Sequence, residues 1–247
     1  FKAHQYLAGS DVTQGNKTGI PILRHTHVLP DIRFDVPSQI AAFQEYPSDK
    51  DSFISAYNMA QWGTANASVV EHGVDTEFWN PRNEERDNVC LSVVNDWPNR
   101  DWCCGFNLWK QTVQDLPVKV YGKSPGLSVP AESTEHLRQI YQKSKIFYNT
   151  SLHSPVPSVL LEAMACGCAI VSTANCMIPE IIENRKNGLI SNDPQELRDF
   201  LGLLLKDENL AKELGDNATK TIQEKYNLER FVNSWNNLLY STVNEYK

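Results

Sequence analysis

An alternation of strand-like and helix-like segments after residue 88 predicts an α/β protein built on a doubly wound parallel sheet. Short runs of β-branched and apolar residues recur there, and a segment with helical spacing follows each of them. Strands that are joined through helices run parallel, because the crossover returns the chain to the same end of the sheet. The last segments, 208–225 and 228–246, have the spacing of amphipathic helices.

Each element is expected from a local pattern along the chain. Before residue 88, we expect a buried strand that ends in polar residues at 19–27, a further apolar element at 51–60, and a strand with a turn at 68–75. Beyond it, strands are expected at 89–94, 118–122, 146–149 and 169–172. Helices are expected at 106–114, 133–144, 158–165, 179–183 and 194–206.

The composition narrows the classes of function. A chain of 247 residues holds one large domain or two small ones. Its formal net charge of −7 argues against a nucleic-acid partner and against a general membrane-surface binder. No apolar run approaches the roughly 20 residues of a membrane span, and no signal peptide is visible. Peripheral membrane association stays open.

The cysteines predict free thiols and no metal site. Cys103 and Cys104 are adjacent, and Cys166 and Cys168 flank a glycine, so neither pair has the usual Cys-x-x-Cys zinc spacing. Free, buried thiols are typical of a reducing compartment, so we expect a cytoplasmic location.

The segment 157–173 is the most informative part of the sequence. A helix is expected to start near Ser158 and to stop at Gly167, before a strand of small and β-branched residues. The start of such a helix carries unpaired N–H groups and a partial positive charge, which suit a phosphate. Glu162 falls in the first turns of this helix, near where a ribose would sit. The alternative is an ordinary packing segment with a surface glutamate.

This segment resembles the donor-site signature of the retaining nucleotide-sugar glycosyltransferases of family 4, which have the GT-B fold. Leu-Glu-Ala-Met-Ala-Cys-Gly at 161–167, Pro-Glu at 179–180 and Asn-Gly at 187–188 carry the resemblance. It implies a GT-B-like α/β fold with a Rossmann-like donor domain. It also implies that Glu162 holds the ribose hydroxyls and that the start of the helix, Pro157, Ser158 and Val159, holds the diphosphate.

Ser154 is where the sequence departs most from that family. Relatives carry a glutamate eight positions before the ribose glutamate, close to the reacting carbon of the sugar, and here that position is Ser154. A hydroxyl supplies no negative charge to an oxocarbenium-like transition state. The Gly-Gly pair of the family is also replaced, by Cys176-Met177. Ser154 is therefore a candidate catalytic position whose competence is open.

Candidate cations and a histidine complete the expected site. The resemblance points to Arg100 for the leaving group, although Cys104 replaces the second cation of the family motif. Lys123, which follows a strand, is a candidate to restore that charge, and a solvated loop arginine is the alternative at Arg100. His27 has the spacing from Pro21 of a cleft histidine in the family, and His25 faces the same side; the alternative is a hydrogen-bonded strand-end histidine.

The resemblance also implies how the chain is divided. Gly73-Val-Asp75, Phe78 or Trp79, and Pro81 match the crossover into the donor domain of the family. Residues 1–80 would then be an abbreviated acceptor-side α/β region, 81–225 the donor-binding domain, and 226–247 a C-terminal helix that packs back on the N-terminal region.

The function that the resemblance implies is a hexosyltransferase of carbohydrate biosynthesis. It would move a hexose from a nucleotide diphosphate sugar to an acceptor hydroxyl with retention, where the acceptor is a saccharide, lipid or protein. The expected donor-binding domain contains no Asp-x-Asp, since the single instance in the chain, Asp49-Lys-Asp51, lies before it, so no metal and no cofactor are expected. The alternative is a nucleotide-sugar-binding protein or enzyme fragment without transferase activity, which Ser154, Cys104 and the short N-terminal part favour.

Overall fold

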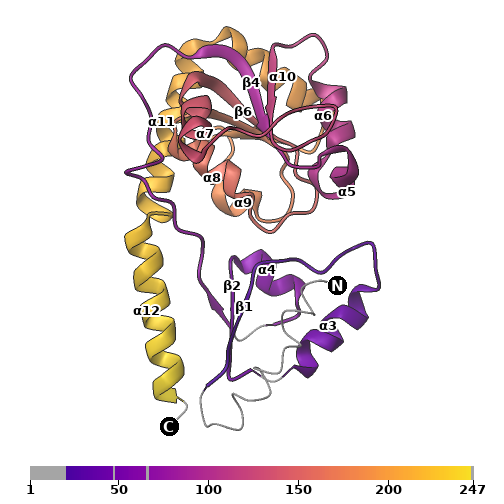
Figure 1. Cartoon of the computed structure of the whole chain (residues 1–247), viewed down its shortest axis with the longest axis vertical. Helices are drawn as coiled ribbons and strands as arrows, with labels where there is room; N and C mark the ends of the chain where they lie inside the picture. The colour runs from indigo at the N-terminus through magenta and orange to yellow at the C-terminus, as the bar shows by residue number, and fades with distance from the viewer. Residues whose placement is uncertain (1–20, 47, 65–66, 246–247) are drawn as a thin grey trace. The chain divides into compact units, whose positions relative to one another are not determined.

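The computed structural model describes residues 21–46, 48–64 and 67–245 of the chain (Figure 1). They form two compact units. The N-terminal unit comprises the described residues up to His72 together with the chain from Glu229 onward, and the central unit comprises Gly73–Leu228. The chain therefore passes between the units after His72 rather than after residue 80, and it returns after Leu228.

The central unit is built on a parallel sheet of five strands in the order β5-β4-β6-β7-β8, which confirms the expected doubly wound α/β fold. The strands are β4 (Asp87–Val93), β5 (Val118–Tyr121), β6 (Ser144–Asn149), β7 (Ala169–Ser172) and β8 (Leu189–Ile190). The connecting helices are η1 (Pro98–Arg100), α5 (Asp101–Cys104), α6 (Phe106–Thr112), α7 (Thr134–Lys143), α8 (Ser158–Ala165), α9 (Ile178–Ile181), α10 (Pro194–Lys206) and α11 (Glu208–Lys225).

The strand order of this sheet reverses at β4. The chain leaves β4 for β5 on one side, and then crosses to β6 on the other side of β4. The loops that follow β4 and β6 therefore diverge at the carboxyl edge of the sheet, which is where open α/β sheets bind ligands. All four residues of β7 are buried, as expected for a strand covered on both faces.

Two glycines allow α11 to approach the C-terminal end of α8 closely. A Cβ atom on Gly215 would lie 2.4 Å from the carbonyl oxygen of Gly167, and Gly167 itself has φ +79°. Arg86 stabilises the same end, because its guanidinium donates to the carbonyl oxygens of Cys166 at 2.6 Å and Ser144 at 2.9 Å. The carbonyl group of Cys166, which ends α8, thus has a side-chain partner.

The N-terminal unit contains a smaller parallel sheet, in which the described strands follow the order β1-β2-β3. These strands are β1 (Leu23–Thr26), β2 (Lys50–Phe53) and β3 (Ser68–Val69), and the described helices are α3 (Val36–Glu45), α4 (Ala56–Gln61) and α12 (Leu228–Glu245). The sequence did not predict α3. The expected apolar element at 51–60 was wrong, since that stretch is the end of β2 followed by the start of α4.

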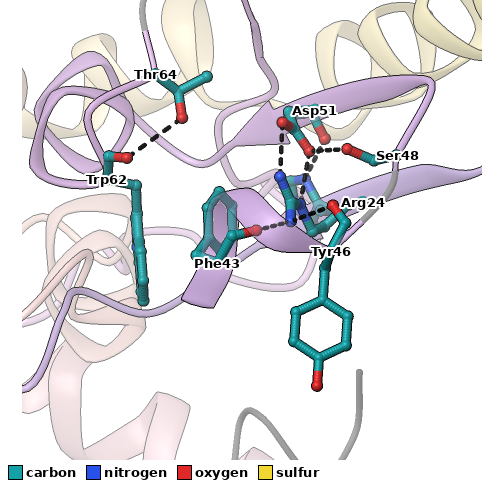
Figure 2. A network of polar contacts seen from close by, with 9 residues as sticks. Arg24, Phe43, Tyr46, Ser48, Asp51, Trp62 and Thr64 are labelled. Carbon is teal, nitrogen blue, oxygen red and sulfur yellow. Dashed lines mark hydrogen bonds and ion pairs between the residues drawn. The ribbon is translucent and has the colours of Figure 1, made fainter. Parts of the chain in front are cut away.

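A buried ion pair ties α3 to this sheet (Figure 2). Arg24 Nε and Nη2 donate to the two carboxylate oxygens of Asp51 at 2.7 and 2.8 Å. The same guanidinium donates to the carbonyl oxygens of Phe43 and Tyr46 at the end of α3, and it stacks 3.5 Å from the centre of the Phe43 ring. The buried residues of β1 are thus the polar side chains Arg24 and Thr26. Such a bidentate, fully bonded pair fixes the position of β1 beside β2.

Candidate functional site

The candidate donor site lies at the carboxyl edge of the central sheet. The loops after β4 and β5 are joined there, since the backbone N–H of Lys123 donates to Asn95 Oδ1 at 2.8 Å. The loops after β6 and β7 are joined in the same way, since Thr173 Oγ1 donates to the carbonyl oxygen of Ser151 at 2.5 Å. The structure thus gathers four strand ends into one edge.

The loop between β6 and α8 rests on the short helix α5. The backbone N–H groups of Leu152 and His153 both donate to the carbonyl oxygen of Cys103, at 2.8 and 3.1 Å. Gly105, at the end of α5, makes this approach feasible. It has φ +65°, and a Cβ atom there would lie 2.2 Å from the carbonyl oxygen of Thr150. A side chain at position 105 would therefore collide with the backbone of this loop.

Ser154 lies in this loop, half-buried and flanked by Pro155. Its neighbour His153 packs against Trp102, with the ring centres 6.0 Å apart. The position expected to face the transferred sugar thus carries a neutral hydroxyl, in a loop that is hydrogen-bonded to α5.

The start of α8 is left open for an anion. Pro157 occupies the cap position, and it offers no side chain to the first N–H groups of the helix. The first turn contains no acidic residue. Ser158 is exposed, whereas Pro157 and Val159 are half-buried. A helix end of this kind has a partial positive charge and N–H donors directed outward, which suits a phosphate oxygen.

Glu162 is not a freely solvated surface carboxylate. It is half-buried, and its Oε2 accepts a hydrogen bond of 3.1 Å from the hydroxyl of Tyr141 in α7. Burial raises the pKa of Glu162 above its ordinary value, and the hydrogen bond from Tyr141 acts in the opposite direction. Burial and the neighbouring Glu162 charge also raise the pKa of Tyr141 well above its usual range, so the tyrosine stays a neutral donor. This partner was not found from the sequence.

The two candidate cations lie on the joined loops after β4 and β5. Arg100 ends the turn η1 and is exposed, with its Nη1 3.4 Å from the carbonyl oxygen of Asn95. Lys123 is also exposed, and its backbone carbonyl accepts from Asp96 N at 2.8 Å. Both side chains are thus available to a ligand at this edge. Cys104 adds no charge, because a hydrogen bond with Cys103 and burial raise its pKa.

His27 belongs to the N-terminal unit, where it follows β1 directly and is exposed. Its ring lies 4.3 Å from that of His25 and 5.6 Å from that of His72, measured between centres. His25 also bonds Ser52 Oγ through Nδ1 at 2.6 Å. Burial, with the neighbouring His27 and His72, lowers the pKa of His25 to about 4, and burial lowers the pKa of His27 as well. The group is therefore neutral near pH 7, and the sequence had not pointed to His72.

The remaining expected features concern thiols, metals and membranes. All six cysteines are free. Over the residues that the structure describes, no group of three or more His, Cys, Asp or Glu side chains is placed to hold a metal ion. None of the described helices has the length and apolar character that crossing a membrane would require.

Solved structures of other proteins identify the type of fold. The Anabaena protein HepE, solved in complex with UDP, aligns with a TM-score of 0.80 and 14% identity over 94% of this chain and 75% of that chain. Sucrose-phosphate synthase from Thermosynechococcus elongatus aligns with a TM-score of 0.78 and 16% identity over 92% of this chain and 69% of that chain. The protein therefore has a GT-B-like α/β fold with parallel sheets.

Sequence relatives point to the family. Residues 118–221 match the model of glycosyl transferases group 1. N-acetyl-alpha-D-glucosaminyl L-malate synthase of Bacillus anthracis is 33% identical over 159 residues, which are 64% of this chain and 39% of the relative. An uncharacterized glycosyltransferase of Methanocaldococcus jannaschii is 25% identical over 68% of this chain and 39% of the relative. Together with the fold, these matches support the glycosyltransferase group 1 family. The chain spans about two fifths of the length of these curated relatives.

Proposed function

We propose that this chain binds a nucleotide diphosphate sugar at the carboxyl edge of its central sheet, as the donor site of a hexosyltransferase. The observation that carries the proposal is the pairing of two features on α8: an uncapped N-terminus and a half-buried carboxylate, Glu162, one turn further on. The first suits the diphosphate and the second suits the ribose hydroxyls. The Anabaena protein HepE, which shares this fold, has been solved with UDP-glucose.

In this proposal, each part of the site has a separate role in the chemistry. The N–H groups at the start of α8, around Pro157, Ser158 and Val159, hold the diphosphate, while Arg100 and Lys123 balance the charge that grows on it as the sugar leaves. These groups make a metal ion unnecessary, so no cofactor is proposed. His27, as a neutral imidazole, exchanges a hydrogen bond with a hydroxyl of the sugar or of the acceptor.

The reaction that we propose is transfer to an acceptor hydroxyl with retention of configuration, in a protein of the family-4 type. The acceptor is a saccharide, lipid or protein. The free thiols of the chain favour a cytoplasmic location. A second candidate function is sugar-nucleotide binding without transfer. It is favoured by the neutral groups at the two positions where relatives carry charge, Ser154 and Cys104.

Calorimetry with UDP-, GDP- and ADP-sugars tests the binding proposal. We expect one of them to bind, and we expect Glu162→Ala to weaken it by about 1–3 kcal/mol, since a charged hydrogen-bond partner of the ligand is lost. Glu213→Ala, which removes an exposed carboxylate on α11, is the matched control and should bind as the wild type does. EDTA should leave the affinity unchanged.

Equal affinities of the wild type and Glu162→Ala for every sugar nucleotide would contradict the assigned role of Glu162. A turnover assay with the same mixture of sugar nucleotides then separates transfer from binding alone.

A further inference from the structure

Tyr141 is a buried side chain that the proposed chemistry has not yet used. Its residue is completely inaccessible to solvent, yet its hydroxyl reaches out of the core to Glu162 Oε2 at 3.1 Å. The two residues come from adjacent helices of the central unit, α7 and α8. A tyrosine hydroxyl in such a position holds only one of the two carboxylate oxygens, so Oε1 is left for another donor.

The ring of Tyr141 is fixed from two sides by other aromatic rings. Trp79, in the segment that leads into β4, and Phe147, in β6, each lie 5.8 Å from it between ring centres, in edge-to-face orientation. The next residue, Gln142, donates to the carbonyl oxygen of Asn80 at 2.7 Å, which holds the same segment against α7. These contacts therefore fix the position of the Tyr141 hydroxyl beside Glu162.

The other charged and titratable groups near this pair have different partners. Arg86 donates to the carbonyl groups of Tyr141, Ser144 and Cys166, and Arg138 pairs with Glu135 and the carbonyl group of Phe78. Burial raises the pKa of the Cys166 and Cys168 thiols, so both are neutral near pH 7. None of the ion pairs among the described residues includes Glu162. The Tyr141 hydroxyl is thus its main support as a carboxylate.

We propose that Tyr141 is a positioning residue of the donor site: its hydroxyl holds one oxygen of the Glu162 carboxylate and so presents the other oxygen to the ribose hydroxyls of the nucleotide. This role rests on the proposed function, because it needs a nucleotide at α8. It extends that function by assigning the orientation and the ionisation of the ribose-binding carboxylate to a buried group that does not touch the ligand.

The chain offers a matched control for Tyr141→Phe. Tyr148 in β6 is also buried, but its hydroxyl bonds Thr112 Oγ1 at 2.8 Å rather than Glu162. Tyr148→Phe therefore removes the same atom from the core of the same unit without changing the carboxylate. Circular dichroism at matched temperatures confirms that both variants are folded.

The experiment measures the carboxyl group and the ligand separately in the full chain. Carbon-13 NMR of glutamate labelled at Cδ, with Glu162→Gln for assignment, follows the titration of Glu162. Calorimetry from acidic to neutral pH measures the affinity for UDP-glucose. The diphosphate of this ligand has no monoester phosphate, which is the group that titrates at about pH 6. We expect Tyr141→Phe to raise the Glu162 pKa and to weaken UDP-glucose binding about tenfold, with a larger loss at lower pH. Tyr148→Phe should change neither.

The proposal is overturned if Tyr141→Phe leaves the Glu162 titration and the affinity as in the wild type, or if Tyr148→Phe alters both to the same degree. Failure of the wild type to bind any UDP-, GDP- or ADP-sugar would refute the proposed function and this role together. Binding by the wild type with an unaltered pKa in Tyr141→Phe would refute this role alone.

Discussion

In the proposed donor site, residue 154 is the position that we expect to decide between sugar transfer and sugar binding alone. The half-buried Ser154 hydroxyl carries no charge, whereas a carboxylate in a water-poor cleft stabilises positive charge that develops on the sugar. We expect weak or absent transfer by the wild type. We expect Ser154→Glu to raise transfer by roughly a hundredfold, which corresponds to about 3 kcal/mol of barrier. A coupled assay for nucleotide diphosphate release measures this rate.

Ser154→Gln is the control for that experiment, because it adds the same bulk to the loop without the charge. Both variants must keep the nucleotide affinity of the wild type for the rates to be compared. Rapid turnover by the wild type, or an equal gain in Ser154→Gln, would contradict the argument from charge. A different group would then have to stabilise the positive charge of the transition state.

At the scale of elements, Gly105 allows α5 to pack closely against the loop that carries Ser154. A Cβ atom there would lie 2.2 Å from the backbone oxygen of Thr150. We expect Gly105→Ala to lower the free energy of unfolding by more than the approximately 1–2 kcal/mol that a left-handed alanine costs, and to weaken nucleotide binding. Urea unfolding and calorimetry measure the two effects.

Gly126→Ala isolates the conformational part of that cost. Gly126 has φ +77°, close to the φ of Gly105, but a Cβ atom there would point into open space, with no described atom beyond its chain neighbours within 4 Å. We expect this variant to lose only the conformational cost and to bind nucleotide normally. Equal destabilisation by the two substitutions would show that the contact between α5 and the loop has no energetic weight.

Several elements were predictable because their signals are local. The bounds of α8, α10 and α11 agree with those expected from the sequence. Asp193 and Asp207 cap α10 and α11 by accepting from backbone N–H groups three residues on, which marks their starts in the sequence. By contrast, the stretch 51–60 mixes the end of a strand with the start of a helix, so no single period could be assigned to it.

The candidate site was only partly predictable for a related reason. The start of α8 and Glu162 belong to one short motif, so their proximity follows from helical spacing. The contact of Glu162 with Tyr141 spans 21 residues of sequence, and the stacking of His27 on His72 joins the ends of two separate strands. Such contacts depend on how elements pack, and neither residue carries a local signal of its partner.

At the scale of the whole molecule, the two units should respond differently to acid. His25 has a pKa of about 4 in the folded chain against 6.5 in the unfolded chain, because it is buried beside His27 and His72. The unfolded chain therefore binds more protons between these values, and the free energy of unfolding falls as the pH falls from 6.5 to about 4. Below that window the contribution of His25 is already lost.

Urea unfolding across this pH range tests the expectation. His25→Gln should flatten the dependence, whereas His136→Gln, a substitution in the central unit, should leave it unchanged. An identical slope for the wild type and His25→Gln would show that the histidine cluster is not protonated on unfolding.

The central unit should also stand alone. Residues 73–228 contain their own sheet, their own buried core and every group that we propose to bind the nucleotide diphosphate. We expect residues 73–228, expressed separately, to fold and to bind the sugar nucleotide as the full chain does.

Circular dichroism and calorimetry measure that outcome, and Glu162→Ala in the isolated unit is the control for a specific site. An unfolded product would show that the central unit needs the N-terminal unit in order to fold, and a folded product without affinity would show that the N-terminal unit contributes to donor binding.

The close approach of Gly167 to Gly215 has a consequence for how such sequences evolve. Gly215 lets α11 approach the backbone of Gly167, which closes the signature and has φ +79°, and Arg86 holds the preceding Cys166 carbonyl group. These are requirements of the fold, whether or not any sugar is transferred. Purifying selection for a folded chain would therefore preserve this part of the motif in a lineage that has abandoned turnover. Genome surveys that equate the motif with an active enzyme would count such pseudoenzymes as catalysts, and residue 154 would be the more informative position to inspect.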